Sequence, residues 1–130
     1  MEGAQAALPR VGKLARQDVP RCSLSERIGD VRNRVRAAGW DICVVVNEEQ
    51  VVLGLLRERE LAADPSTTAE QVMRSGPATY RPDALAADSV ERMEKRGVGG
   101  VLVTRSDGRL IGWLRREDAA RAASESRPAS

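Results

Sequence analysis

Residues 107–118 read Asp-Gly-Arg-Leu-Ile-Gly-Trp-Leu-Arg-Arg-Glu-Asp, and this stretch decides the fold that the sequence predicts. A copy lies 58 residues earlier, at 49–60, and reads Glu-Gln-Val-Val-Leu-Gly-Leu-Leu-Arg-Glu-Arg-Glu. Each copy starts at a turn and continues as an apolar strand with a central glycine. An arginine follows the strand, and charged residues after it begin a helix. The same offset, without a gap, pairs Gly39 with Gly97. The chain is therefore a tandem repeat.

Each half is expected to contain a helix, two strands joined by a tight turn, and a closing helix. Capping-box spacing places the first helix start at Ser23 to Glu26, and its copy starts after Pro82. Glycine ends both helices. The two turns are predicted at 47–50 and 106–108, the closing helices at 58–63 and 116–123, and a short lead-in helix at 68–74.

The repeats are expected to span 10–63 and 68–121, joined by a linker at 64–67. An N-terminal extension, 1–9, precedes them, and a disordered tail, 122–130, rich in Ser and Ala, follows. Because one half buries too little surface to be stable alone, the two should share a core. The predicted fold class is α/β (α+β), with two pseudo-symmetric βαββα repeats packed as one module.

The composition argues against several classes of function. The chain of 130 residues carries 21 Lys and Arg against 19 Asp and Glu, a net charge of +2 that favours neither nucleic acid nor a membrane surface. It contains no histidine, which excludes Ser-His-Asp and Cys-His catalysis and imidazole metal ligands. No nucleophile stands beside a base, so we expect no enzyme and no metal site. The arginines at 32, 34 and 36 are interpreted as a solvated helix face.

Cys22 and Cys43 are the only cysteines. They are interpreted as reduced, small hydrophobic residues of a cytoplasmic protein, and a redox pair is the alternative. The first 14 residues have no signal-peptide core, and no apolar run approaches the ~20 residues that span a bilayer.

The order of elements, repeated at this spacing, resembles a pair of cystathionine-β-synthase (CBS) domains, also called a Bateman module. Residues 107–118 carry the best match, and 71–73 followed by 77–79 and 81–83 resemble the usual start of a repeat. Both halves look most like the short, stand-alone CBS pairs of bacteria. The resemblance implies two clefts between the repeats that bind adenosyl compounds such as AMP, ATP, S-adenosylmethionine or NAD, and association into a homodimer.

The resemblance also implies ligand contacts in the second half. Asp118 occupies the position that accepts hydrogen bonds from ribose hydroxyls, and a carboxylate suits this role because it accepts two such bonds. Thr79 lies on the strand that reaches ribose or phosphate, and Arg115 stands where the family has Thr or Ser. The other residues assigned to this cleft are Pro77, Trp113 and Val101, although Trp113 is interpreted first as a core or dimer residue.

The first half departs from the family pattern, so its cleft is predicted to be the weaker one. Glu60 replaces the Asp, Arg57 replaces the Thr or Ser, and Arg21 stands opposite Thr79. Arg57 and Arg115 have two interpretations: they bind phosphate, or they pair with the carboxylates three residues on, Glu60 and Asp118, and close the clefts.

Two functions follow from these interpretations. The first is a non-enzymatic regulatory or sensor module that requires no cofactor, binds an adenine nucleotide (AMP, ADP or ATP) or S-adenosylmethionine, and signals to an unknown protein partner. The alternative is a ligand-free dimerisation or scaffold domain whose clefts are closed by arginine–carboxylate pairs.

Overall fold

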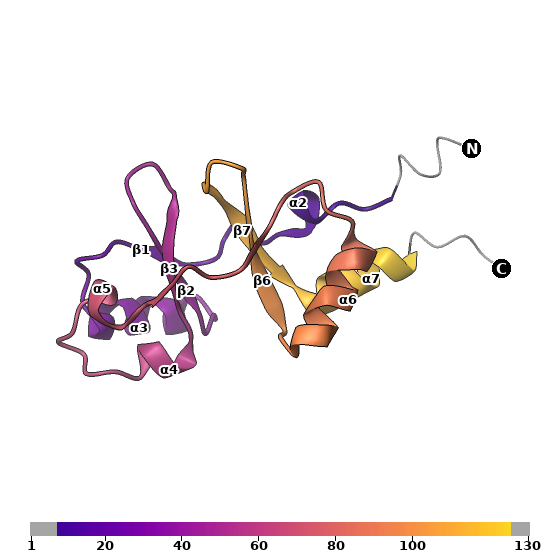
Figure 1. Cartoon of the computed structure of the whole chain (residues 1–130). Coiled ribbons are helices and arrows are strands. Elements are labelled where there is room, and N and C mark those ends of the chain that lie inside the picture. The colour runs from indigo at the N-terminus through magenta and orange to yellow at the C-terminus, as the bar shows by residue number, and fades with distance from the viewer. Residues whose placement is uncertain (1–7, 126–130) are drawn as a thin grey trace. The chain divides into compact units, whose positions relative to one another are not determined.

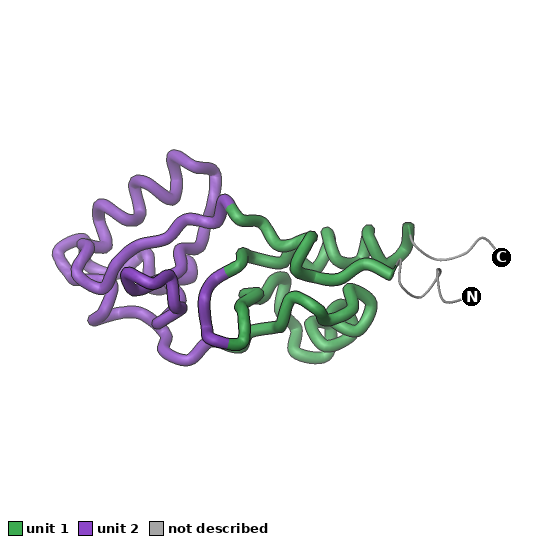
Figure 2. Tube along the Cα trace, turned by 90° about the horizontal axis from the view of Figure 1, so that it is seen from above, with its two compact units in different colours: residues 1–17, 78–106, 111–130 green, residues 18–77, 107–110 purple. Residues whose placement is uncertain are grey.

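The computed structural model (Figure 1) describes residues 8–125. It divides into two compact units (Figure 2), which are described one at a time. Unit 2 comprises residues 18–77 and 107–110, and unit 1 contains 78–106, 111–125 and the N-terminal segment up to Gln17.

Unit 2 is built on a four-stranded sheet in the order β1 (Arg21–Cys22), β2 (Cys43–Val46), β3 (Val52–Leu56) and β4 (Arg74–Ser75). Strand β1 runs parallel to β2, whereas β2–β3 and β3–β4 are antiparallel. Three helices belong to this unit: α3 (Ile28–Ala37), α4 (Glu58–Leu61) and α5 (Ala69–Val72).

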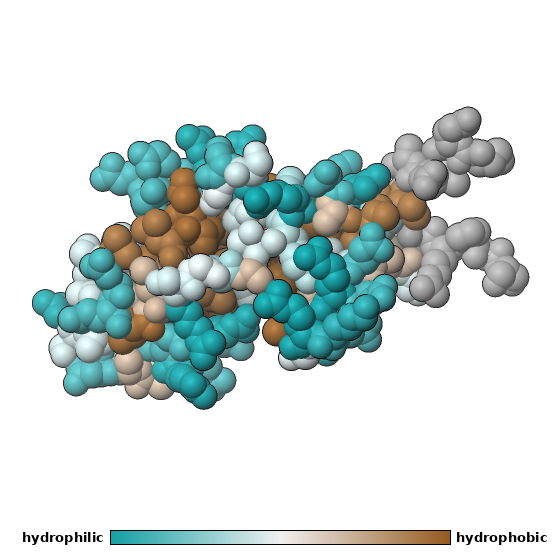
Figure 3. Space-filling view, viewed as in Figure 1, coloured by the Kyte–Doolittle hydropathy of each residue, from teal (hydrophilic) through white to brown (hydrophobic). Residues whose placement is uncertain are grey.

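The core of unit 2 forms where α3 packs on the sheet. The buried residues of α3 are Ile28, Val31 and Val35, at helical spacing. They join Val45 of β2 and Leu56 of β3 in one apolar cluster. In the space-filling view, apolar side chains gather over the strands of this unit (Figure 3), and residues 51–53, at the start of β3, are half-buried.

Unit 1 repeats this plan with three strands in the order β5 (Thr79–Tyr80), β6 (Gly100–Thr104) and β7 (Leu110–Arg115). Strand β5 runs parallel to β6. The helices are α2 (Val11–Leu14), α6 (Ala86–Arg96) and α7 (Arg116–Glu125). Val11 of α2, Met93 of α6 and Leu114 of β7 share one core cluster and are fully buried.

Each short lead-in helix packs in the unit formed by the body of the other repeat. The N–H of Val11 in α2 donates to the carbonyl of Ala84 at 2.9 Å, and the equivalent N–H of Ala69 in α5 donates to the carbonyl of Glu26 at 2.8 Å. These two bonds are related by the 58-residue offset. Helix α2 of the first repeat therefore completes unit 1, and α5 of the second repeat completes unit 2.

The repeated strand glycines allow the lead-in backbone to approach. A Cβ built on Gly112 of β7 would lie 2.5 Å from the carbonyl oxygen of Arg16, and one on Gly54 of β3 would lie 3.0 Å from that of Arg74. Arg16 and Arg74 are equivalent positions just after α2 and α5. No side chain fits there without moving the backbone.

Most predicted elements are confirmed, with differences at their ends. Gly97 adopts a left-handed conformation with φ 67° and ends α6 as predicted. The first helix begins at Ile28 and not near Ser23, because the Ser23 N–H donates to Glu26 Oε2 at 2.8 Å in a turn that precedes the helix. Helix α7 continues to Glu125, so the tail prediction is wrong for 122–125. The predicted extension 1–7 and tail 126–130 lie outside the described residues.

Within residues 8–125, no helix is long and apolar enough to cross a lipid bilayer.

Candidate functional site

Asp118 lies in the first turn of α7, directly after β7. Its side chain is 22% exposed and has a long ion pair, 3.8 Å from Oδ1 to Nη1 of Arg121, which is itself 66% exposed. A carboxylate near a helix N-terminus is stabilised by the helix dipole. Because this ion pair is long and its arginine is exposed, the Asp118 carboxylate retains capacity to accept further hydrogen bonds.

Thr79 is half-buried on the short strand β5 and is in register with Leu102 of β6. Arg115 ends β7 and is also half-buried. Both residues belong, with Asp118, to unit 1. The structure therefore places the Thr79 hydroxyl, the Arg115 guanidinium and the Asp118 carboxylate in the same unit.

Trp113 and Val101 are buried, with 7% and 6% exposure. The Trp113 indole packs against Gly100, where a Cβ would collide with the ring. Its backbone exchanges hydrogen bonds with Arg16: the Arg16 N–H donates to the Trp113 carbonyl at 2.7 Å, and the Trp113 N–H donates to the Arg16 carbonyl at 3.0 Å. These contacts make Trp113 a packing residue, and little of its ring is left to contact a base. Pro77 is half-buried and belongs to unit 2.

Glu60, the counterpart of Asp118 in the first half, is only 7% exposed. One carboxylate oxygen accepts the backbone N–H of Arg57 at 2.8 Å, which caps the start of α4. The other lies 3.3 Å from Nε of Arg74 on β4. Both oxygens of Glu60 are therefore engaged within unit 2. The third residue assigned to this half, Arg21, donates from Nη1 to Oε1 of Gln50 at 2.8 Å.

The two halves thus differ in what their carboxylates can do. Asp118 is partly exposed and weakly paired, whereas Glu60 is buried and has a structural partner on each oxygen. Arg121 pairs with Asp118 and Arg74 with Glu60, two arginines that the closed-cleft hypothesis did not name. Among residues 8–125, no group of three or more His, Cys, Asp or Glu side chains could hold a metal ion.

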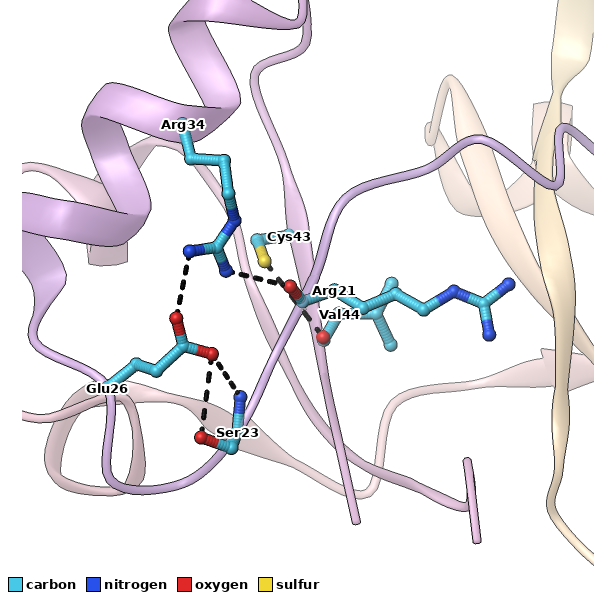
Figure 4. A network of polar contacts seen from close by, with 6 residues as sticks. All are labelled: Arg21, Ser23, Glu26, Arg34, Cys43 and Val44. Atoms are coloured by element: carbon cyan, nitrogen blue, oxygen red, sulfur yellow. Dashed lines mark hydrogen bonds and ion pairs between the residues drawn. The ribbon is translucent and has the colours of Figure 1, made fainter. Parts of the chain in front are cut away.

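Sequence reasoning missed a polar network at the start of unit 2 (Figure 4). The guanidinium of Arg34 on α3 donates to Glu26 Oε1 at 2.8 Å and to the carbonyl of Arg21 on β1 at 2.9 Å. Burial raises the pKa of Glu26, but hydrogen bonds from Arg34 and Ser23 outweigh it and hold the pKa below its usual range. Arg34 therefore ties helix α3 to strand β1, while its side chain stays 47% exposed, as expected for a residue on a solvated helix face.

Residues 69–125 match the family model of the CBS domain. Among solved structures, the CBS domains of a transcriptional regulator from Streptococcus pneumoniae share 27% identity over 86% of this chain and 97% of that one, with a TM-score of 0.75. The second half therefore matches the CBS domain family, and the whole chain has the fold of a CBS domain pair.

Two further solved structures of similar fold contain nucleotides. CBSX2, in complex with AMP, is 19% identical over 90% of this chain and 97% of that one, with a TM-score of 0.79. The cytosolic domain of the Mg²⁺ channel MgtE, in complex with ATP, is 22% identical over 92% of this chain and 51% of that one, also with a TM-score of 0.79. At these identities the likeness shows the fold alone.

Curated relatives are longer than this chain. An uncharacterised protein from Methanopyrus kandleri is 26% identical over an alignment of 116 residues that covers 83% of this chain and 59% of that protein. The arabinose 5-phosphate isomerase KpsF of Escherichia coli is 26% identical over an alignment of 115 residues that covers 83% of this chain and 35% of the isomerase. The chain thus spans between one third and three fifths of the length of these relatives.

Proposed function

We propose that this CBS pair is a non-enzymatic regulatory module that binds an adenosyl compound through unit 1. The observation that carries the proposal is the state of Asp118, which is partly exposed and keeps hydrogen-bonding capacity beside its long ion pair with Arg121. In this proposal the carboxylate accepts the two ribose hydroxyls. Thr79 and Arg115 contact the ribose or phosphate, and a guanidinium matches phosphate geometry.

The nucleotides bound by CBSX2 and MgtE make adenine nucleotides the first ligands to test. Unit 2 is proposed as the weaker site, because using Glu60 would require breaking the cap on Arg57 and the ion pair with Arg74. Trp113 and Val101, which are buried in the same unit, are assigned a packing role.

The test is a thermal-shift screen with AMP, ADP, ATP, S-adenosylmethionine and NAD. A ligand at 100 times its dissociation constant adds about 2.7 kcal/mol, which for a chain of this length raises Tm by about 10 °C. We expect Asp118→Ala to lose the shift. Glu117→Ala is the matched control, because Glu117 is exposed in the same helical turn. An equal shift in Asp118→Ala would contradict the site assignment.

The alternative is a ligand-free scaffold domain, and one observation favours it: the carboxylates of both halves already have arginine partners, Arg74 and Arg121. Under this alternative none of the five compounds raises Tm, and Asp118→Ala lowers the stability of the free protein. The same screen therefore separates the two functions.

A homodimer, a cytoplasmic location and a regulated protein partner of unknown identity complete the proposal. Trp40 and Leu61 support the dimer, because they line a hollow of about 250 Å³ between α3 and α4, and Trp40 is half-exposed. Large aromatic side chains are enriched at protein interfaces. Sedimentation equilibrium of the chain and of Trp40→Ala tests this, and an unchanged monomer mass for both would contradict it.

A further inference from the structure

The two cysteines of the chain come together in unit 2. Cys22 lies on β1 and Cys43 on the adjacent parallel strand β2, and both are free and buried, with 4% and 0% exposure. Cys22 is in register with Val45, two residues from Cys43 on the same strand. Because strand side chains alternate between faces, Cys43 and Val45 point to the same side. Both cysteines accordingly belong to one core cluster.

The Cys43 thiol donates to the backbone carbonyl of Val44, which lies 3.9 Å from its sulfur (Figure 4). The neighbouring Cys22 side chain, together with burial, raises the pKa of the Cys43 thiol. Cys43 therefore keeps its proton. Because the thiolate is the nucleophilic form of cysteine, the raised pKa makes Cys43 a poor first attacker.

Cys22 is also the cysteine that a small reagent can approach. It lines a surface hollow of about 510 Å³ together with Ser23, Glu26 and Gln50. The guanidinium of Arg34 reaches across the same region, where Figure 4 shows it beside Cys43 and hydrogen-bonded to the carbonyl of Arg21. A fixed positive charge beside a cysteine pair favours thiolate over thiol.

We propose that Cys22 and Cys43 form a peroxide-sensitive dithiol that closes into an intramolecular disulfide. The Cys22 thiolate attacks the terminal oxygen of a hydroperoxide, ROOH, which yields Cys22 sulfenic acid and, after proton uptake, ROH. The sulfur of Cys43 then attacks the sulfenic sulfur, forms the S–S bond and releases water. The two thiols lose two electrons and two protons, and the hydroperoxide is reduced to ROH and water.

Formation of the disulfide changes the packing of unit 2, which contains both cysteines, and does not involve unit 1. A disulfide requires Cα atoms within about 6.8 Å, whereas the register offsets Cys43 by two residues from the partner of Cys22. Closing the bond therefore draws β1 along β2 and moves Arg21, whose carbonyl Arg34 holds. The second repeat has Tyr80 and Val101 at the equivalent positions, so only the first repeat carries a cysteine pair.

The test is intact-mass analysis of the full chain after treatment with hydrogen peroxide and alkylation with N-ethylmaleimide under denaturing conditions. We expect a monomer lighter by two hydrogen atoms that carries no alkyl group, and two alkyl groups after treatment with dithiothreitol. Two alkylated thiols after peroxide treatment, or only disulfide-linked dimers, would overturn the proposal.

Two single-cysteine variants test the order of attack. In Cys43→Val, which copies the residue of the second repeat, Cys22 should be trapped by dimedone as a sulfenic acid. In Cys22→Val, Cys43 should react at least about tenfold more slowly, because its side chain is 0% exposed and burial alone still raises the pKa of its thiol. Equal labelling of the two variants would overturn the assignment of Cys22 as the attacking residue. Circular dichroism confirms that each variant is folded, and the wild-type mass measurement does not depend on either variant.

Discussion

The carboxylate of the buried Glu60 lies 3.3 Å from the guanidinium of Arg74, and its other oxygen caps helix α4 at the Arg57 N–H. Glu60 is 7% exposed, whereas the Arg74 side chain is 61% exposed. The two partners therefore contribute unequally to stability. The exposed arginine is replaced by water at little cost, and the buried carboxylate is not.

We expect Glu60→Ala to lower the free energy of unfolding by about 1–3 kcal/mol, because the Arg57 N–H loses its acceptor. Arg74→Ala should cost at most about 1 kcal/mol, since exposed ion pairs contribute little. Urea unfolding of both variants measures these values. An equal loss in the two variants would show that the ion pair, and not the cap, is the stabilising contact.

Gly112 permits the backbone of Arg16 to pass over strand β7. We expect Gly112→Ala to destabilise the chain by about 1–3 kcal/mol, because its Cβ would lie 2.5 Å from the Arg16 carbonyl oxygen. Gly99→Ala is the matched control: no described atom lies within 4 Å of its Cβ, and we expect a change within about 0.5 kcal/mol. Thermal unfolding compares the two, and similar Tm values would contradict the close approach.

The hydroxyl of Tyr80 is buried and finds no hydrogen-bond partner among residues 8–125. The Tyr80 ring itself is contacted by Arg92, whose guanidinium carbon lies 4.4 Å from the ring centroid. We expect Tyr80→Phe to be neutral or stabilising by up to about 1 kcal/mol, because it removes the buried polar group and keeps the ring. Denaturant unfolding checks this, and a clear loss of stability would reveal a partner for the hydroxyl.

The Glu26–Arg34 ion pair should make the free energy of unfolding depend on pH in the acidic range. The folded-state pKa of Glu26 is lowered, so its stabilisation is fully present above the ordinary pKa of about 4.3 and is lost as the pH falls through the folded-state pKa. We expect Arg34→Met to be less stable than wild type near neutral pH, with a difference that shrinks on acidification.

Arg36→Met is the control for this titration, because Arg36 is exposed on the same helix. Its difference from wild type should stay constant with pH. Unfolding free energies measured by urea titration at several pH values distinguish the two variants. A difference for Arg34→Met that does not change with pH would show that its effect comes from packing or from the hydrogen bond to Arg21.

The sequence predicted the element order well because the signals are local. The central glycines at 54 and 112, the helix-ending Gly97 and the turn at Gly108, which has φ 89°, all lie where the sequence placed them. The start of α3 was wrong because Ser23 and Glu26 have capping-box spacing but bond to each other in a turn before the helix. A side-chain–backbone bond of this kind competes with helix formation, and its sequence signature is the same.

The candidate site was predictable only in part. The family pattern identified Asp118, Thr79 and Glu60, and the structure shows which of these side chains are engaged. It was not predictable that Arg74, fourteen residues from Glu60, would supply the ion pair, or that Arg34 would join α3 to β1. Long arginine side chains reach several partners at similar cost, so spacing alone does not choose among them.

The 58-residue offset, the strand–turn–strand units and the glycines appear in both halves, so the repeat is visible in the sequence alone. The structure was needed to show that each lead-in helix completes the unit of the opposite repeat, with α2 bonded to Ala84 and α5 bonded to Glu26. The similarity of the two repeats explains why. Periodicity identifies the apolar face that a helix buries, but two nearly equivalent repeats offer it nearly equivalent partners. The choice between them depends on chain connectivity and on packing summed over distant residues.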